Sequence, residues 1–326
     1  MKILFLVDAI NVHTQRIESA LKSHGHFVNT VKIKDCDKET HLGDYKTCLI
    51  SPIRRIPPGV YKRLPPTIFY ASMAYEILYE MLEKRITPDS EFKNQISRAT
   101  GIIIDSVAVE EAINQIFKFK GNYLQIPYGV DSSLFTDIKL KNSEKIQIAA
   151  IRNWSEVHRQ SELMPFITEI LEEEKDVVLH ISGTGPKKPD AINKIEKFLK
   201  SGQIIDHGNV SNEEVLDILR ASHIFLSNSK IDGSSVSMLE AMAVGALVIT
   251  TNTVGNKYWI NSDVNGFLFD ETPTSHIRKA ITLAKDRNEV YLRMIENAQS
   301  KAFKNANWEI NRESMCNFIE QNDDEH

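Results

Sequence analysis

The segment HIFLSNSKIDGSSVSMLEAMAVGALVIT, residues 223–250, decides the fold. It opens with an apolar run of strand length (223–227), continues with a helical pattern (235–243) and closes with a second apolar run (246–250). Two strands joined by a helix in this order pair in parallel within one sheet. The segment therefore predicts an open parallel sheet with helices packed on its faces.

The same alternation runs along most of the chain and pauses only at 127–144, where Pro127, Gly129 and a polar tail indicate a linker. We therefore predict an α/β fold of two doubly wound, Rossmann-like domains at 1–130 and 131–306, with a C-terminal helix and tail, 307–326, that can cross back to the first domain. The other expected strands are 2–8, 27–33, 46–50, 67–71, 101–105, 122–126, 146–151, 177–182 and 203–206, and the other expected helices are 14–24, 73–86, 107–118, 160–174, 189–200, 212–220, 274–286, 288–304 and 307–321.

Composition narrows the class of protein. The 326 residues are 42% hydrophobic and 25% charged, as in ordinary globular proteins, and a net charge of −5 argues against nucleic acid as the partner. No apolar run approaches the about 18 residues of a membrane helix. The apolar start is short and interrupted by Asp8, which indicates a buried first strand. Cys36, Cys48 and Cys316 are odd in number and far apart, so we expect reduced thiols and a cytoplasmic location.

A small basic excess lies in the first domain, at Arg54, Arg55, Lys62 and Arg63. One interpretation is a solvated loop, and the other is a surface for phosphate or anionic lipid, which would place the protein at the inner membrane face. The sequence leaves both open.

The densest chemical signal is the turn that opens the 235–243 helix. Asp232 and Glu240 bracket it, and Gly233 lets the backbone approach a ligand closely. N–H groups at a helix start can receive an anion such as a nucleotide diphosphate, and the flanking carboxylates can accept hydrogen bonds from sugar hydroxyls. The alternative is an ordinary capped helix with Glu240 on the surface. The predicted anion-binding residues at the helix start are Ser234, Ser235, Val236 and Ser237.

This stretch resembles the retaining GT-B glycosyltransferases of family 4 (glycosyl transferases group 1). Their signature is a carboxylate, seven residues and a Glu, then A-M-A-x-G and a strand; here it reads Asp232, Glu240 and 241–245, with Asp where most members have Glu. One subgroup carries D-G-[TS]-x-x-S-x-L-E-A-M, which this chain matches closely. The resemblance covers about 120–310 and includes the segments Val254-Gly255-Asn256, Trp259-Ile260 and Asn265-Gly266-Phe267-Leu268.

Arg152 directly follows the 146–151 strand, where its guanidinium can pair bidentately with a diphosphate. The family has Arg here and usually a Lys a few residues on. This chain has His158 and Arg159 instead, so Arg159 either supplies the second cation or is a solvated charge.

Two further loops follow strands of the second domain. In the family, a G-x-G matching Gly183 and Gly185 lies beside the nucleotide, and the segment matching 207–210 holds the base through backbone groups. The resemblance then assigns the ribose hydroxyls to Glu240. The nucleotide-binding residues expected in these loops are Gly183, Gly185, Asn209 and Val210.

The first domain carries a weaker signal. The segment 9–16 resembles an H-T-x-R variant of the family's acceptor loop, so His13 and Arg16 are expected on the acceptor side unless His13 is only a cap or surface residue. Tyr128-Gly129-Val130-Asp131 resembles the family's P-x-G-V-D hinge. Many relatives carry a cleft His after the strand at 67–71; this chain has none there, and the domain is short.

The resemblance implies transfer of a sugar, with retention, from a nucleotide-sugar donor to a hydroxyl of a saccharide or lipid-linked acceptor, in cell-surface glycan or glycolipid synthesis. Asp232, Arg152 and His13 are the expected catalytic residues. No cofactor is expected besides the nucleotide-diphosphate sugar, itself a substrate, and no residue cluster has metal-ligand spacing. The alternatives are a catalytically inactive binding or scaffold protein and a sugar-nucleotide epimerase of the same architecture.

Overall fold

The computed structural model describes residues 1–326 except 39–40, 73–74, 128, 139–140, 142 and 324–326. The chain divides into two compact units: unit 1 is Met1–Gly129 with Asn307–His326, and unit 2 is Val130–Ala306. The predicted hinge residue Tyr128 lies outside the described residues, as do the first two residues of the predicted helix 73–86.

Unit 1 is built on a six-stranded parallel sheet in the order β2-β1-β3-β4-β5-β6. Side chains alternate between two cores. Ile3 and Phe5 face α1 and α14, whereas Leu4 and Leu6 face the core shared with α3, α4 and α5. Burial on both faces explains why these strands read as continuous apolar runs. The elements are β1 (Lys2–Val7), α1 (Val12–Ser23), β2 (Phe27–Lys32), the 3₁₀ turns Ile33–Lys38 and Leu42–Asp44, β3 (Thr47–Ser51), α2 (Pro58–Tyr61), β4 (Thr67–Ser72), α3 (Tyr75–Glu83), α4 (Ser90–Ser97), β5 (Gly101–Ile104), α5 (Val107–Phe117), β6 (Asn122–Gln125) and α14 (Trp308–Asp323).

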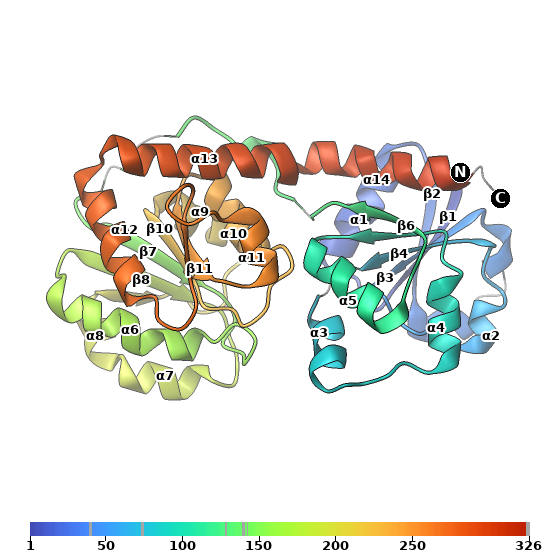
Figure 1. Ribbon diagram of the computed structural model, residues 1–326, viewed down its shortest axis with the longest axis horizontal. Helices are drawn as coiled ribbons and strands as arrows, with labels where there is room; N and C mark the ends of the chain where they lie inside the picture. The colour runs from blue at the N-terminus through green and yellow to red at the C-terminus, as the bar shows by residue number, and fades with distance from the viewer. Residues whose placement is uncertain (39–40, 73–74, 128, 139–140, 142, 324–326) are drawn as a thin grey trace. The chain divides into compact units, whose positions relative to one another are not determined.

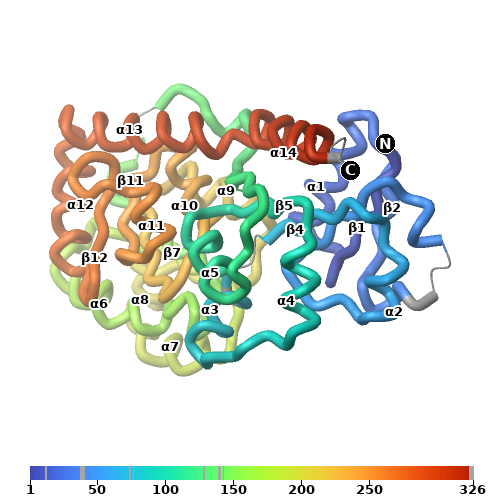
Figure 2. The backbone as a smooth tube through the Cα atoms, turned by 45° about the vertical axis from the view of Figure 1, so that its right-hand side comes forward, coloured from blue at the N-terminus to red at the C-terminus, as the bar shows by residue number. Residues whose placement is uncertain are grey.

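Unit 2 repeats the plan with the order β12-β11-β10-β7-β8-β9. Helices α6, α7, α8 and α12 cover one face of the sheet, and α9, α10 and α11 cover the other (Figures 1 and 2). Helix α13 packs into the first core with its N-terminal part and into the second with its C-terminal part. The elements are the 3₁₀ turn Ser132–Leu134, β7 (Ile146–Ile151), α6 (Gln160–Glu173), β8 (Val177–Ser182), α7 (Lys188–Lys194), α8 (Glu196–Ser201), β9 (Ile204–Asp206), α9 (Asn212–Ala221), β10 (Ile224–Ser227), α10 (Val236–Ala243), β11 (Leu247–Thr251), α11 (Val254–Trp259), β12 (Phe267–Phe269), α12 (Thr274–Asp286) and α13 (Glu289–Ala306).

Each sheet has a point at which the strand order reverses. In unit 2 the chain forms β7, β8 and β9 in one direction and then returns to add β10 on the other side of β7. In unit 1 the reversal lies between β1 and β3. Connecting helices lie on opposite faces at such a point, so the loops after the two strands diverge and leave room for a ligand. The carboxyl ends of β7 and β10 are therefore where unit 2 should bind one.

The predicted α/β, doubly wound architecture is confirmed, and the structure adds local detail that differs from the expected elements in one helix. The predicted helix 189–200 is broken at Ile195 into α7 and α8. The predicted linker contains a 3₁₀ turn, and Val130 and Leu134 from it are buried in unit 2. The short elements α2, α4, α11 and β12 were not expected, because runs this brief carry too few periods to be recognised.

Candidate functional site

Arg152 and Asp232 meet at the reversal point of the unit 2 sheet. Arg152 follows β7 directly, and Asp232 lies in the loop after β10. Arg152 Nη2 lies 2.9 Å from Asp232 Oδ1 and 3.2 Å from Oδ2, and Arg152 Nη1 donates to Ser235 Oγ at 2.8 Å. Both charged side chains are nearly buried, with exposed fractions of 11% and 10%. The structure thus joins the two residues expected to handle diphosphate and sugar in one ion pair.

The guanidinium of Arg152 has further contacts and one nitrogen without a hydrogen-bond partner among the described residues. Its Nη2 lies 3.1 Å from His158 Nδ1 and 3.3 Å from Ser229 Oγ. Its Nε is buried and has no hydrogen-bond partner among the described residues. Buried polar groups are nearly always satisfied in native proteins, so the unpaired Nε–H of Arg152 is an exception that a ligand acceptor would satisfy if the side chain moved toward it.

A cavity of about 190 Å³ opens beside this pair, at the carboxyl ends of the strands. Five predicted site residues line it together: Arg152, Gly183, Asn209, Val210 and Ser237. The remaining lining residues, which the sequence interpretation did not assign to the site, are Ile151, Asn153, His158, Ser182 and Val215.

The two glycines of the loop after β8 have different roles. Gly183 has φ of +90°, lines the cavity, and a Cβ there would lie 2.6 Å from the carbonyl oxygen of Arg152. A Cβ on Gly185 would lie 2.3 Å from the carbonyl oxygen of Trp154, and Gly185 is not in the lining. At both positions a residue larger than glycine would clash with the backbone of the segment that carries Arg152 and Trp154. Gly185 therefore shapes the site through packing and not from the cavity wall.

Helix α10 begins beside Arg152 without a side-chain cap. Its N-cap residue is Ser235, whose hydroxyl accepts from Arg152, and no side-chain capping bond is formed. The Ser234 hydroxyl accepts from the Trp259 indole N–H at 3.1 Å. The alternative of an ordinary side-chain-capped helix is therefore wrong. The helix start keeps backbone N–H groups for an anion, although Val236 itself is absent from the cavity lining.

Gly233 precedes α10, and Glu240 lies within it. A Cβ on Gly255 would lie 2.2 Å from the Gly233 carbonyl oxygen, so α11 packs directly on the loop that carries Gly233 and Asp232. Glu240 is 6% exposed, so the alternative of a surface carboxylate is wrong. It does not line the cavity.

Arg159 is not brought to the cavity. Its Nε donates to the backbone oxygen of Asn228 at 3.0 Å, and its Nη2 lies 3.4 Å from Asn228 Oδ1. A left-handed backbone, with φ of +46°, precedes α6 and turns the side chain this way. The residue that contacts Arg152 in this segment is His158.

His13 and Arg16 belong to unit 1. The α1 start is held by a capping box between Asn11 and Thr14, and burial, with the nearby Arg16, lowers the pKa of His13. Arg16 Nη1 donates to the Gly129 carbonyl at 3.0 Å, and its guanidinium lies 4.7 Å from the ring centroid of Trp308. Arg16 therefore ties α1 to the start of α14.

A second ion pair lies at the reversal point of the unit 1 sheet. Arg54 Nη1, beyond β3, lies 2.6 Å from Asp8 Oδ1, beyond β1. Burial raises the pKa of Asp8, although the Arg54 charge opposes the change. Arg55 pairs with Asp89 and Glu91. Carboxylates thus offset the charges of Arg54 and Arg55.

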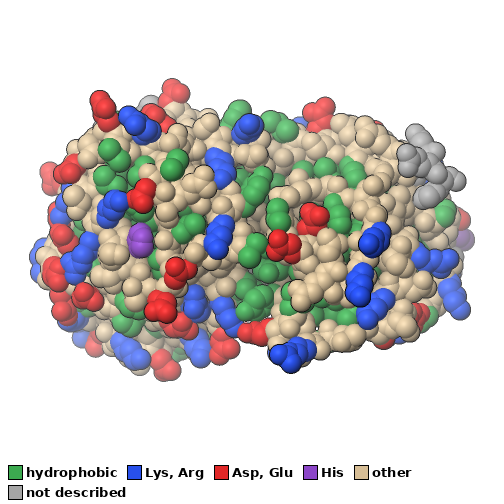
Figure 3. All heavy atoms as spheres, viewed as in Figure 1, with side chains coloured by type: hydrophobic (Ala, Val, Ile, Leu, Met, Phe, Trp, Pro, Cys, Tyr) green, Lys and Arg blue, Asp and Glu red, His purple; other side chains and the backbone are tan. Residues whose placement is uncertain are grey.

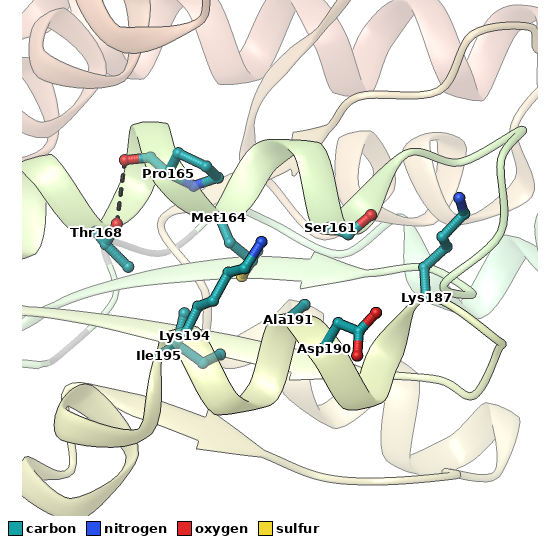
Figure 4. A pocket seen from close by; sticks show the side chains of 9 residues that line it. All are labelled: Ser161, Met164, Pro165, Thr168, Lys187, Asp190, Ala191, Lys194 and Ile195. Carbon is teal, nitrogen blue, oxygen red and sulfur yellow. Dashed lines mark hydrogen bonds between the residues drawn. The ribbon is translucent and has the colours of Figure 1, made fainter.

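A second, larger pocket has a volume of about 390 Å³. It is formed between α6 and α7, with Ser161, Met164 and Pro165 on one wall and Lys187 and Lys194 on the other (Figure 4). The Thr168 hydroxyl on its rim is already bonded to the Pro165 carbonyl. None of the predicted site residues reaches it, so we place the site at the smaller cavity.

Ser229, like His158, contacts Arg152 without having been expected there. The sequence feature that could have revealed Ser229 is its position in the turn after β10, two residues beyond the strand, where side chains project toward the ligand edge.

Among the residues that the structure describes, no group of three or more His, Cys, Asp or Glu side chains could hold a metal. No helix within that same part of the chain is long and apolar enough to cross a membrane.

Known proteins share both the fold and the sequence pattern. HepE of Anabaena, solved with UDP, matches at a TM-score of 0.73 over 98% of this chain and 100% of its own, with 13% identity. An uncharacterized glycosyltransferase of Methanocaldococcus jannaschii is 24% identical over 243 residues, 68% of this chain. One subunit of human phosphatidylinositol N-acetylglucosaminyltransferase is 26% identical over 132 residues, 40% of this chain.

The matched regions span 61% of the archaeal relative's length and 27% of the human one's. The similarity to HepE extends over both units, and the predicted GT-B fold is confirmed. The family model for glycosyl transferases group 1 matches residues 133–301, more than half of the chain and nearly all of unit 2. The chain therefore belongs to the glycosyl transferases group 1 family.

Proposed function

We propose that the protein is a retaining glycosyltransferase of family 4 that moves a hexose-type sugar from a UDP-sugar to an acceptor hydroxyl. The observation that carries the proposal is the Arg152–Asp232 pair, which joins a cation and a carboxylate at the reversal point of the unit 2 sheet. UDP is the first nucleotide to test because HepE, a protein of this fold, was solved with UDP and with UDP-glucose.

The donor diphosphate is assigned to Arg152 and the start of α10. The unused Nε–H of Arg152 and the uncapped N–H groups of the helix can hold it. These groups stabilise the negative charge that develops on the diphosphate as the bond between sugar and phosphate breaks. Gly183, Asn209 and Val210 then surround the nucleotide, and Glu240 takes the ribose hydroxyls.

Asp232 is assigned to the sugar. Without donor, it is held by Arg152. When the diphosphate takes the guanidinium, Asp232 becomes free to accept hydrogen bonds from sugar hydroxyls. In the retaining step, the bond between the anomeric carbon and the phosphate oxygen breaks, and the acceptor oxygen bonds to the same face of that carbon. The acceptor proton passes to the departing phosphate, so no separate base is needed.

The acceptor is assigned to unit 1, with His13 as its expected ligand. An apolar pocket of about 490 Å³ lies there, walled by Ile33, Ile53 and Phe92 and edged by Arg54 and Arg55. It supports a lipid-linked acceptor, as does the name of the human relative, and therefore a role in cell-surface glycan or glycolipid synthesis.

We propose that the basic surface of unit 1 contacts an anionic membrane. Several Lys and Arg side chains lie over unit 1 at the right of the face drawn in Figure 3. The carboxylate partners of Arg54 and Arg55 offset part of this charge. Cys36, Cys48 and Cys316 are all free thiols, which agrees with the reducing cytoplasm as the proposed compartment.

The deciding experiment incubates the wild-type protein with a panel of UDP-, GDP- and ADP-sugars, with and without short saccharide and lipid-linked acceptors. We expect release of UDP and a glycoside whose proton NMR coupling shows the donor's anomeric configuration. Inversion would contradict the retaining assignment. An epimerised sugar nucleotide would identify an epimerase, and donor binding without turnover would identify a binding or scaffold protein.

A further inference from the structure

His158 lies against Arg152 in the donor site. Its Nδ1 is 3.1 Å from Arg152 Nη2 and 3.3 Å from Ser229 Oγ. A guanidinium can only donate hydrogen bonds, so Nδ1 must be the acceptor in this contact. An imidazole that accepts through Nδ1 carries its proton on Nε2 when it is neutral. The contact with Arg152 therefore fixes the tautomer of His158.

The surroundings keep this imidazole neutral. Burial lowers its pKa to about 4, the Arg152 charge adds to the effect, and Asp232 opposes it. The side chain lines the cavity beside Arg152, Gly183 and Ser237. Among the described residues, no hydrogen bond involves Nε2, which leaves its N–H for a ligand.

We propose that His158 is a diphosphate-binding residue: its Nε2–H donates to a donor phosphate oxygen, while Nδ1 holds the Arg152 guanidinium toward the same phosphate. The inference rests on the proposed function. The neutral imidazole of His158 then takes the place of the second cation that was expected in this segment. The other residue expected there, Arg159, donates to the backbone oxygen of Asn228.

The two nitrogens can be tested separately. In His158→Asn the amide oxygen falls near the position of Nδ1 and can accept from Arg152, but the side chain is too short to donate where Nε2–H does. In His158→Gln the amide nitrogen reaches about as far as Nε2 and can donate there. The exposed His24, 33% exposed in its side chain, provides His24→Asn as a control in unit 1.

Calorimetry with UDP as the probe, and with uridine as a probe that lacks phosphate, separates the roles. We expect His158→Asn to bind UDP about tenfold to a hundredfold more weakly than wild type, since one hydrogen bond to a charged acceptor is lost. His158→Gln should stay within about threefold. Uridine affinity should be the same in all variants, and His24→Asn should match wild type with both probes.

Other outcomes overturn the inference. Wild-type UDP affinity in His158→Asn, with weak binding only in His158→Gln, would reduce His158 to a support for Arg152. Equal losses for UDP and uridine, together with a lower Tm, would indicate a structural role. Failure of wild type to bind UDP, GDP or ADP would remove the proposed donor site itself, and that result is independent of position 158.

Discussion

Arg152 and Asp232 neutralise each other in a nearly buried environment. Removing two charges from water is costly, and their attraction repays it only when the contacts are good, as the paired distances of 2.9 and 3.2 Å are here. In the proposed function, a diphosphate takes the place of Asp232 beside Arg152. We therefore expect a lower affinity for the nucleotide than Arg152 alone would give, because the contact with Asp232 must first break.

Asp232→Asn should separate binding from chemistry. If Asp232 acts on the sugar in the transition state, kcat should fall by roughly 100-fold or more. UDP affinity should stay the same or rise, because Arg152 no longer has to leave a carboxylate. Steady-state kinetics and UDP calorimetry measure the two effects. Asp263→Asn, which changes an exposed carboxylate paired with Lys279, is the control and should leave both quantities unchanged.

Full turnover in Asp232→Asn would contradict the assignment of Asp232 to the sugar. A fall in both turnover and UDP affinity would instead assign Asp232 to holding Arg152 in place. UDP affinity distinguishes the two roles, because it should fall only if Asp232 supports the residue that binds phosphate.

At this scale, the sequence identified the residues that follow strands directly. Arg152 ends β7 and Asp232 lies just beyond β10, and strand ends of a parallel sheet share one edge. It could not place Arg159 or His158, because one left-handed residue decides which of the two side chains faces the cavity. Such a backbone value depends on the surrounding packing and has no periodic signal.

At the scale of elements, α11 acts on the site without touching the cavity. A Cβ on Gly255 would lie 2.1 Å from the Asp232 carbonyl oxygen and 2.2 Å from that of Gly233. Both contacts are with backbone, so no side chain can move aside. The position of the Asp232 loop is therefore set by how closely α11 can approach it.

Gly255→Ala should displace the Asp232 loop and lower kcat by about tenfold or more, since small misplacements of reacting groups are costly. Gly59→Ala is the control: it lies in α2, and a Cβ there would have nothing within 4 Å. Steady-state kinetics of both variants, with circular dichroism to check folding, provides the measurement. Equal activities in the two variants would show that the loop position is not critical.

Long elements were predictable, whereas several of the short ones were not. Helices such as α6 and α12 carry several apolar periods, and their expected and observed bounds agree within a residue. Helix α11 has six residues and β12 has three, so neither shows a period. The break at Ile195 was missed because the apolar pattern continues across it.

At the scale of the whole molecule, three histidines of unit 2, one buried and two half-buried, are expected to make stability depend on pH. Burial lowers the pKa values of His158, His180 and His223 in unit 2 to about 4, from an ordinary value of 6.5. Between these values the unfolded chain binds more protons than the folded one, by about three near pH 5. Stability should therefore be full above about pH 6.5 and fall as the pH drops toward 4.

Thermal unfolding at pH 7, 6 and 5 tests this dependence, and Tm should fall by about 5 °C or more across the series. His180 donates to Gln147 and accepts from His207. Replacing it as His180→Gln removes one titrating group and should flatten the pH dependence by about a third. An unchanged slope in that variant would mean that other groups control the effect.

The C-terminal helix belongs to the core of unit 1. Met315, Cys316 and Ile319 of α14 are buried with Ile3, Phe5 and Ile17. Ile319→Asp places a charge in this core and should destabilise unit 1 by several kcal/mol, on the order of the cost of a large core deletion or more. The matched control is Ile310→Asp, because Ile310 lies on the same helix but is 50% exposed.

Limited proteolysis should show rapid cleavage within 1–129 in Ile319→Asp and not in Ile310→Asp. UDP binding should persist in both variants, because the proposed donor residues all belong to unit 2. Loss of UDP binding in Ile319→Asp alone would show that the donor site depends on an intact unit 1.

The split origin of unit 1 also sets an order of events during synthesis on the ribosome. Residues 1–129 emerge first, yet the apolar face of α1 is covered by α14 only after all of unit 2 has been translated. At about 5–20 residues per second this interval lasts roughly 10 to 35 s. Unit 2, which is continuous in the chain, can complete its core during that time. Of the two units, unit 1 therefore begins to form first and is completed last. Until α14 is made, the nascent chain exposes an apolar surface that chaperones would have to shield.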